Sequence, residues 1–140
     1  DYQGYRSDIA RTAVLGRPSA KLAAYYQAML EGEEAMLAAI RPGIPAEDLF
    51  RIAVATVQEA GVPHYRRQHV GHAIGLEVYD ALSLAPGVQT PLEAGMTLAV
   101  ETPYYELGWG GVQVEDLVCV TDDGVRLLNR SSRDLIVLPV

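Results

Sequence analysis

Apolar side chains recur at helical spacing in the first third of the chain. From Ala20 to Ala39 the positions that repeat every three or four residues are apolar with one polar exception, Glu33. The apolar positions are Leu22, Tyr25, Tyr26, Met29, Met36, Leu37 and, just after this stretch, Ile40. This period predicts an α-helix with one buried face. Ser19 is placed to cap its start, and the break at 41–43 contains the proline that ends it.

A second amphipathic stretch follows Pro45, a residue that suits the first turn of a helix. Small and apolar side chains again fall on one face, at Leu49, Ile52, Ala53, Thr56 and Val57. We expect this helix to end at Gly61, because glycine readily adopts the backbone conformation that ends helices.

The rest of the chain has the pattern of strands. Residues 1–15 predict an extended segment or a strand pair, and 69–79 contain short apolar runs broken by glycines, as in strands beside a site. Buried strands are predicted at 96–100, 112–120 and 135–140, with a hairpin turn at 122–124. Two helices followed mainly by antiparallel strands predict an α+β fold.

Composition restricts the class of protein. The chain has 140 residues, of which 49% are hydrophobic, enough for one domain with a core and too many for a disordered tail. Its net charge of −7 argues against a nucleic-acid partner, whose phosphates demand a basic surface. No apolar run reaches the roughly 18 residues of a membrane span. The single cysteine, Cys119, forms no internal disulfide and is expected to be buried and inert.

The candidate chemistry lies in four residues, each in or beside an apolar, strand-like run: Asp8, His72, Glu101 and Glu115. A buried carboxylate has to be paired, hydrogen-bonded or bound to a metal. Three carboxylates that converge repel one another unless cations hold them. One imidazole with several carboxylates suits Mn²⁺, Co²⁺, Zn²⁺ or Fe²⁺.

Each of these residues also has a purely structural explanation. A single histidine between glycines is more often structural than a ligand, and a glutamate in a strand is usually exposed at an edge. Glu115 beside Asp116 equally fits a solvated strand end. Taken one by one, the four residues favour the structural explanation.

Four segments in a fixed order change this balance. They are Gly4-Tyr5-Arg6-Ser7-Asp8-Ile9-Ala10-Arg11-Thr12, Gly71-His72-Ala73-Ile74-Gly75-Leu76-Glu77-Val78, Val100-Glu101-Thr102-Pro103-Tyr104-Tyr105 and Gly111-Val112-Gln113-Val114-Glu115-Asp116. Together they resemble the motif set of the pita-bread metallopeptidases, the family of Xaa-Pro aminopeptidases and prolidases. The resemblance implies a pita-bread (creatinase/aminopeptidase) fold, with helices packed on a curved, mostly antiparallel sheet.

The resemblance also implies a function and a set of site residues. The family holds two divalent metal ions, here Mn²⁺ or Co²⁺ with Zn²⁺ or Fe²⁺ as alternatives, and Asp8, His72, Glu101 and Glu115 match four of its ligands. His72 and Glu101 would be catalytic, Glu101 by moving protons. The implied reaction is hydrolysis of peptide bonds near the N-terminus of short peptides, by a cytoplasmic enzyme that is a homodimer at full length.

One ligand of the family has no match, because its aspartate would stand just upstream of Asp1. We therefore expect residues 1–140 to be the C-terminal part of a catalytic domain whose N-terminal part precedes them. The alternative function on the same fold is a metal-independent, creatinase-like amidinohydrolase or a non-catalytic binding module.

Two departures from the family pattern concern the substrate. Tyr79 stands where proline-cleaving members have a histidine, and Gln113 stands where an arginine is frequent. A phenol donates a hydrogen bond but supplies no positive charge at neutral pH, so we predict slow Xaa-Pro cleavage. Tyr79 and His69, three residues before His72, are the candidate substrate-binding residues, with a structural role for His69 left open.

Several conspicuous side chains near these motifs have two explanations. Tyr104, Tyr105 and Trp109 either line the substrate pocket or pack a glycine-rich hairpin. Tyr5 is predicted in the core or the pocket wall. His64, Arg66 and Arg67 are predicted in a solvated turn.

Overall fold

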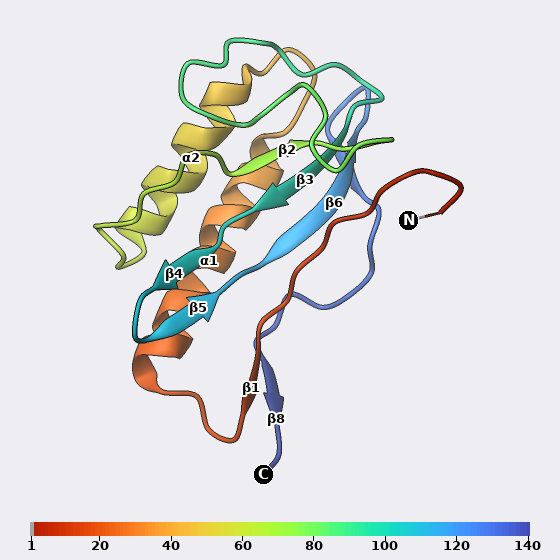
Figure 1. The fold of residues 1–140 in the computed structure, drawn as a ribbon. Helices are drawn as coiled ribbons and strands as arrows, with labels where there is room; N and C mark the ends of the chain where they lie inside the picture. The colour runs from red at the N-terminus through yellow and green to blue at the C-terminus, as the bar shows by residue number, and fades with distance from the viewer. Residues whose placement is uncertain (1) are drawn as a thin grey trace.

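Two helices cover one face of an antiparallel sheet in the computed structural model, which describes residues 2–140 (Figure 1). The helices are α1 (Ala20–Ala39) and α2 (Ala46–Glu59). The four-stranded sheet has the order β2-β3-β6-β7, built from β2 (Gly71–Ala73), β3 (Thr97–Glu101), β6 (Glu115–Val120) and β7 (Val125–Leu127). The predicted α+β class is confirmed.

Both helices begin and end where the sequence predicted. The Ser19 side chain accepts a hydrogen bond from the backbone N–H of Leu22 at 3.2 Å, which satisfies one of the free donors of the first turn. After α2 the chain reverses at Gly61, whose φ of 108° suits glycine. Gly32 lies in the middle of α1, where a Cβ atom would stand 2.4 Å from Val57 of α2. The missing side chain therefore lets the two helices pack closely.

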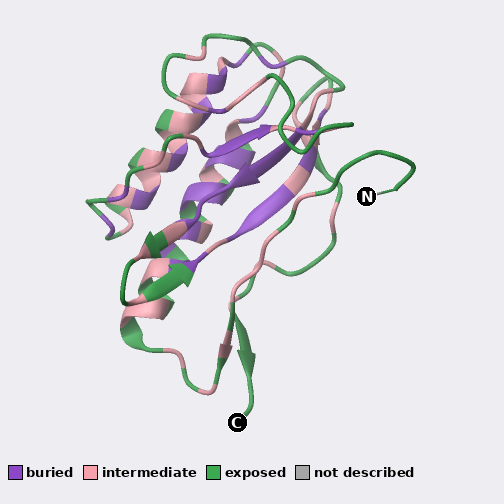
Figure 2. Ribbon diagram, viewed as in Figure 1, coloured by how far each residue is buried: buried purple, intermediate pink, exposed green. Residues whose placement is uncertain are grey.

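The core fills the space between helices and sheet (Figure 2). It is made of apolar side chains from both layers: Met36, Leu37, Ile40, Leu49, Ala53, Leu98, Val100, Val118 and Val120. Because successive residues of a strand point to opposite faces, the strand that buries Val118 and Val120 presents Glu115 and Leu117 on its other face. The sheet therefore has one face covered by the apolar core and an opposite, free face that carries Glu115.

Two small ladders extend from this sheet. β4 (Tyr104–Glu106) pairs antiparallel with β5 (Gly110–Val112), and β1 (Ala13–Leu15) pairs parallel with β8 (Ile136–Leu138). The predicted strand 112–120 is therefore divided between two ladders, because Gln113 and Val114 lead from β5 into β6.

Three further predictions met different outcomes. A strand does form within 135–140, at β8, but its predicted burial is wrong, because β8 pairs with β1 at the surface and all three of its residues are exposed. Cys119 is half-buried rather than fully buried. The turn at 122–124 is confirmed, and there Thr121 N–H donates to the carbonyl of Gly124 at 2.9 Å.

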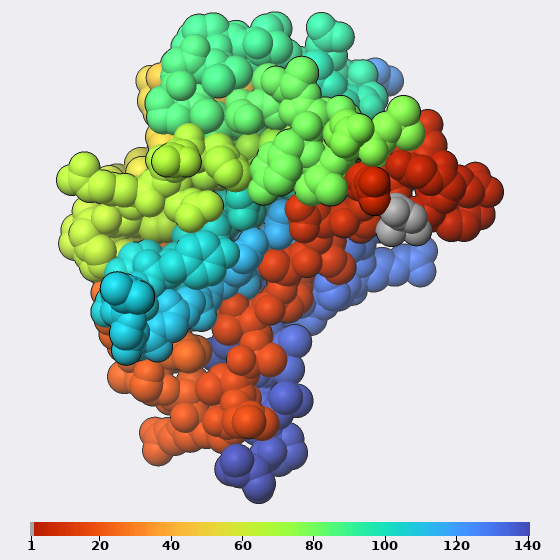
Figure 3. Space-filling model, viewed as in Figure 1, coloured from red at the N-terminus to blue at the C-terminus, as the bar shows by residue number. Residues whose placement is uncertain are grey.

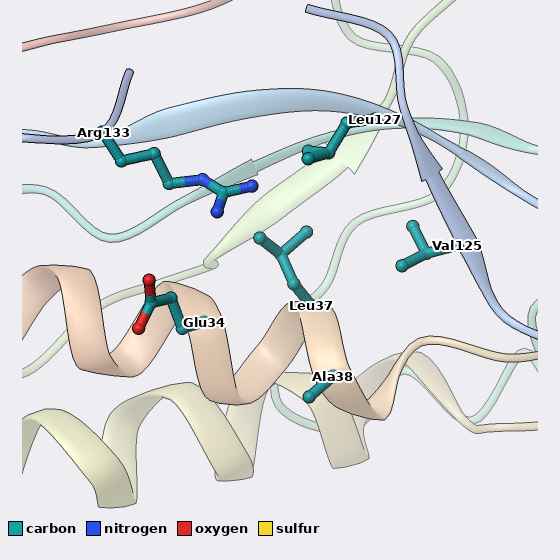
Figure 4. A pocket seen from close by; sticks show the side chains of 6 residues that line it. All are labelled: Glu34, Leu37, Ala38, Val125, Leu127 and Arg133. Carbon is teal, nitrogen blue, oxygen red and sulfur yellow. The ribbon is translucent and has the colours of Figure 1, made fainter. Parts of the chain in front are cut away.

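A shallow apolar pocket of about 290 Å³ lies between α1 and β7 (Figure 4). Figure 4 shows its lining: Glu34, Leu37 and Ala38 from α1, Val125 and Leu127 from β7, and Arg133 from the segment before β8. Within the described residues, no helix is long and apolar enough to cross a membrane.

Candidate metal centre

Three segments that are distant in the sequence meet on the free face of the sheet. Asp8 lies on the N-terminal segment, which runs beside β6 (Figure 1). That segment is fixed by a pair of backbone hydrogen bonds between Ala10 and Glu115, at 3.1 and 3.3 Å. His72 is the central residue of β2, and Glu115 is the first residue of β6. Backbone pairing therefore brings all three side chains to one place.

The ligand atoms of Asp8, His72 and Glu115 all lie within 4.8 Å of one another. Asp8 Oδ2 stands 3.9 Å from Nε2 of His72. The imidazole and the Glu115 carboxylate are buried, whereas Asp8 is half-buried. The structure thus assembles three of the four ligands predicted from the sequence.

The orientation of His72 leaves one ring nitrogen free for a ligand. Nδ1 lies 3.1 Å from the carbonyl oxygen of Ala73, an acceptor, so the ring proton belongs on Nδ1. Nε2 then carries a lone pair on the side of Asp8. Gly71 makes this placement possible, since at its φ of 148° a Cβ atom would stand 2.4 Å from the carbonyl oxygen of Ala99.

Glu101, the fourth predicted ligand, stands directly across the ladder from Glu115. Like charges in this position destabilise a sheet unless something lies between them. Gln113 does so, because its Nε2 donates to Glu101 Oε2 at 3.1 Å and to Glu115 Oε2 at 3.0 Å. The amide is in turn oriented by the Tyr105 hydroxyl, which donates to Oε1 of Gln113 at 2.6 Å. A neutral amide joins the carboxylates but does not cancel their charge.

The electrostatics of the cluster favour a cation. Burial, and then the charges of Asp8 and Glu101, raise the pKa of Glu115 to about 8, and the hydrogen bond from Gln113 offsets only part of this effect. Without a cation, Glu115 therefore holds a proton at neutral pH. A buried set of carboxylate oxygens with one imidazole nitrogen has the donor chemistry of a divalent transition-metal site, so these residues fit such an ion.

Residues 1–122 match the model of metallopeptidase family M24. The chain belongs to this family. Its residues are 35% identical, over 139 residues, to the Xaa-Pro dipeptidase of Lactobacillus delbrueckii subsp. lactis, a match that covers 99% of this chain and 38% of the relative.

Solved structures agree with the M24 assignment. Dipeptidase PepE from Mycobacterium ulcerans superposes with a TM-score of 0.94 at 35% identity, covering 99% of this chain and 38% of that one. The Xaa-Pro dipeptidase from Bacillus anthracis gives 0.93 at 37% identity, covering 98% and 39%. The pita-bread fold predicted from the motifs is thereby confirmed. The chain spans about 38% of the length of these M24 relatives.

The two predicted substrate-binding residues border the carboxylate cluster. His69 Nδ1 lies 3.3 Å from Glu101 Oε1. The ring of Tyr79 stands 4.0 Å from that of His72, centroid to centroid, and its side chain is 63% exposed. Desolvation, and then the charges of Glu101 and Asp8, raise the pKa of Tyr79, so this phenol is neutral at pH 7. Both residues are thus placed between the carboxylates and solvent.

The aromatic residues after Glu101 divide into two groups. Tyr104 and Trp109 pack against Tyr25 of α1, with ring centroids 5.1 and 5.5 Å away. Tyr105, the next residue of β4, instead bonds to Gln113 at the site. The packing explanation therefore holds for Tyr104 and Trp109, whereas a place for Tyr105 in a substrate pocket stays a prediction.

Two placements predicted for neighbouring residues are corrected. Tyr5 is 64% exposed and is therefore not in the core, although it does line a small surface pocket with Ile74 and Leu117. Arg67 is not in a solvated turn, since its Nη2 lies 3.9 Å from Glu101 Oε1 and its side chain is only 22% exposed. Arg66 and His64 are exposed, as predicted.

Asp116 is a residue that sequence reasoning did not single out, beyond the alternative that Glu115 and Asp116 form a solvated strand end. It is completely buried rather than solvated, and it accepts hydrogen bonds from Arg11, Asn129 and Arg133. Arg11 also donates to the carbonyl oxygen of Glu115 at 2.7 Å, so the backbone of a predicted ligand is held by the same guanidinium. The signal in the sequence was Arg11 itself, three residues after Asp8 in the first motif.

Proposed function

We propose that residues 1–140 form the C-terminal part of a catalytic domain that hydrolyses peptide bonds near the N-terminus of short peptides with the help of divalent metal ions. The observation that carries this proposal is the buried convergence of Asp8, His72 and Glu115, whose ligand atoms lie within 4.8 Å of one another. Membership of a metallopeptidase family and relatives named as dipeptidases support it.

In this proposal the metal ligands are Asp8, His72, Glu101 and Glu115, and the complete protein holds two ions, Mn²⁺ or Co²⁺. Bound divalent ions lower the pKa of water towards neutrality and polarise a carbonyl oxygen. Glu115 faces both Asp8 and Glu101, so its carboxylate would be a central member of the donor set that holds the ions. The contribution of the chain is to hold these donors on paired strands, where they do not need to reorganise.

Other residues of the site position and protonate the substrate. Glu101 has one oxygen bonded to Gln113 and the other facing His69, so it is the proposed group that moves a proton from the attacking water to the leaving amine. His72, with its Nδ1 proton held by Ala73, is fixed for its role at the metal. Tyr79 offers a neutral O–H donor at the mouth of the site.

Metal content and hydrolysis in the full-length protein test this assignment. His72→Ala and Glu115→Ala should each lower bound Mn²⁺ or Co²⁺ and reduce hydrolysis of dipeptides by more than about 100-fold, since even changes behind metal ligands cost 10–100-fold. His64→Ala is the matched control, because this histidine is exposed and packs against Tyr104 instead. Unchanged metal content and activity in both ligand variants would favour the alternative, a metal-independent amidinohydrolase or a binding module.

A further inference from the structure

The β4–β5 hairpin is the connection between two of the proposed metal ligands. It begins shortly after Glu101 at the end of β3 and ends shortly before Glu115 at the start of β6. Each of its strands has three residues, and a two-stranded hairpin is at best marginally stable in water by itself. Its placement therefore depends on what it packs against. Figure 3 shows the hairpin at the surface, against the first residues of α1.

One face of the hairpin reaches the carboxylate cluster. The Tyr105 hydroxyl donates to Oε1 of Gln113. That amide in turn bonds to Glu101 and Glu115. Gly111 stands opposite Tyr105 in the ladder, and a Cβ atom there would lie 2.6 Å from the tyrosine ring. The ring therefore lies against the backbone of β5, and a movement of the hairpin would move both Tyr105 and Gln113.

The opposite face of the hairpin is held by Lys21, the only lysine among the 140 residues. Its Nζ donates to both carboxylate oxygens of Glu106, each at 2.7 Å. The same ammonium lies 4.6 Å from the ring centroid of Trp109 in the hairpin turn and 5.2 Å from that of Tyr25 on α1. The hydrogen bonds from Lys21, and then from Tyr104, lower the pKa of Glu106, so the pair is ionised at neutral pH.

The several contacts of this ammonium matter more than the ion pair by itself. The side chains of Lys21 and Glu106 are 38% and 37% exposed, and an ion pair at such a position contributes little alone. A cation above an aromatic ring adds an attraction of similar size at each ring. Because one ammonium makes all these contacts, its loss should release the Glu106 carboxylate and the hairpin turn together.

We propose that Lys21 is a positioning residue that holds the β4–β5 hairpin against α1 through Glu106. The hairpin in turn keeps Tyr105 and Gln113 in contact with the two carboxylates. This proposal rests on the peptidase function proposed above and deepens it, because it names a residue behind the hairpin that controls the spacing of the donors. Lys21 acts through the hairpin and contacts neither the substrate nor the ions.

Hydrolysis of a dipeptide such as Ala-Leu by the full-length protein with metal tests this role. Lys21→Met should lower kcat by about 3- to 10-fold and leave KM within about twofold, the scale of one or two net hydrogen bonds lost around Glu101. Glu106→Gln should cause the same loss, and the double variant should lose no more than either single one, because both changes remove one contact. Lys21→Arg keeps the charge and should retain most of the activity. Tyr104→Phe is the matched control, because it removes a hydroxyl bonded to Glu106 but leaves both contacts to Lys21.

Hydrogen–deuterium exchange of residues 102–114 is a second measurement, and it does not depend on catalysis. Lys21→Met should increase exchange there by at least about threefold and leave α2 unchanged. Equal exchange and equal kcat in wild type and Lys21→Met would overturn the proposal, as would additive losses in the two single variants. Faster exchange throughout the protein would show that Lys21 only stabilises the fold, which also overturns it. If the wild type cleaves no dipeptide, the proposed function fails, and exchange in 102–114 alone decides whether Lys21 holds the hairpin.

Discussion

Glu115 and Asp116 are adjacent on β6 and both are buried, yet they lie in opposite electrostatic environments. Asp116 points to the helix side, where hydrogen bonds from Arg11, Asn129 and Arg133 outweigh its burial and lower its pKa. Glu115 points to the other face, where burial and two carboxylates raise its pKa to about 8. One carboxylate is hydrogen-bonded by the chain itself, whereas the other is a ligand of the metal ion only in the function proposed above. Incomplete internal pairing therefore distinguishes Glu115 from Asp116, its neighbour on β6.

The largest effect on stability should come from the hydrogen-bonded pair of Arg11 and Asp116. Arg11→Met removes the guanidinium that holds Asp116 and the carbonyl of Glu115, and it should lower the free energy of unfolding by about 3–5 kcal/mol, as when one partner of a buried ion pair is lost. Urea unfolding of the full-length protein measures this. Arg51→Gln, at an exposed position, should stay within about 0.5 kcal/mol of wild type. A similarly small change for Arg11→Met would refute the structural role of the pair.

In the metal-free protein, the raised pKa of Glu115 should make the fold less stable as pH rises. A carboxyl group whose folded pKa exceeds its unfolded value binds more protons when folded, so its contribution falls between the unfolded pKa of 4.5 and the folded value of about 8. The full shift corresponds to about 5 kcal/mol, and solvent screening of this partly accessible site should reduce the loss in EDTA to the order of 2–3 kcal/mol. Glu115→Gln should remove this part of the slope. Glu33→Gln should remove a second, separate part of the slope, because Glu33 in α1 also has a pKa raised to about 8 by burial and Asp116.

Bound metal should counteract this loss of stability with rising pH. Because the ion displaces the proton from Glu115, stabilisation by Mn²⁺ should grow from pH 5 to pH 8 in wild type and be weak in Glu115→Gln. Thermal unfolding with and without Mn²⁺ at several pH values measures this. A metal effect that is independent of pH would contradict the assignment of Glu115 as the proton-holding ligand.

A smaller effect concerns the exposed edge of the site. Tyr79→His should raise kcat for Ala-Pro by about tenfold, because a histidine beside His72 can carry a positive charge in the transition state and a phenol cannot. Kinetics on Ala-Pro and on a dipeptide without proline separate a specific gain from a general one. Fast cleavage of Ala-Pro by the wild type, with a neutral or harmful Tyr79→His, would restore an unmodified prolidase-like specificity.

The smallest effect is expected from the hydrogen bond that Tyr105 donates to Gln113. Tyr105→Phe removes the hydroxyl that orients Gln113 and should slow hydrolysis about threefold, the scale of one net hydrogen bond. Tyr104→Phe, which changes a hydroxyl bonded to Glu106 and His64, is the matched control on the same strand. Equal rates for wild type and Tyr105→Phe would show that Gln113 keeps its orientation unaided.

The sequence predicted those features that depend on local spacing. The helices followed from apolar period and caps, and the motif residues Asp8, His72 and Glu115 do converge. The misjudged residues depend on contacts between distant segments. Asp116 is buried because Arg11 and Arg133 reach it from positions 105 and 17 residues away, and β8 is exposed because, within residues 2–140, it pairs with β1 alone. The placement of Arg67 could not be predicted for the same reason, because its partner Glu101 lies on another element.

The separation of the ligands along the chain has a consequence for the order of folding. Asp8 reaches the site on a segment whose neighbour Arg11 contacts Glu115 across 104 residues, so no short piece of the chain carries the donor set. Contacts between such distant positions form slowly, because a large loop must close first, whereas α1 and α2 depend on local hydrogen bonds. An ion would therefore find its donors only after the helices and sheet have docked. Metal should slow unfolding far more than it speeds refolding.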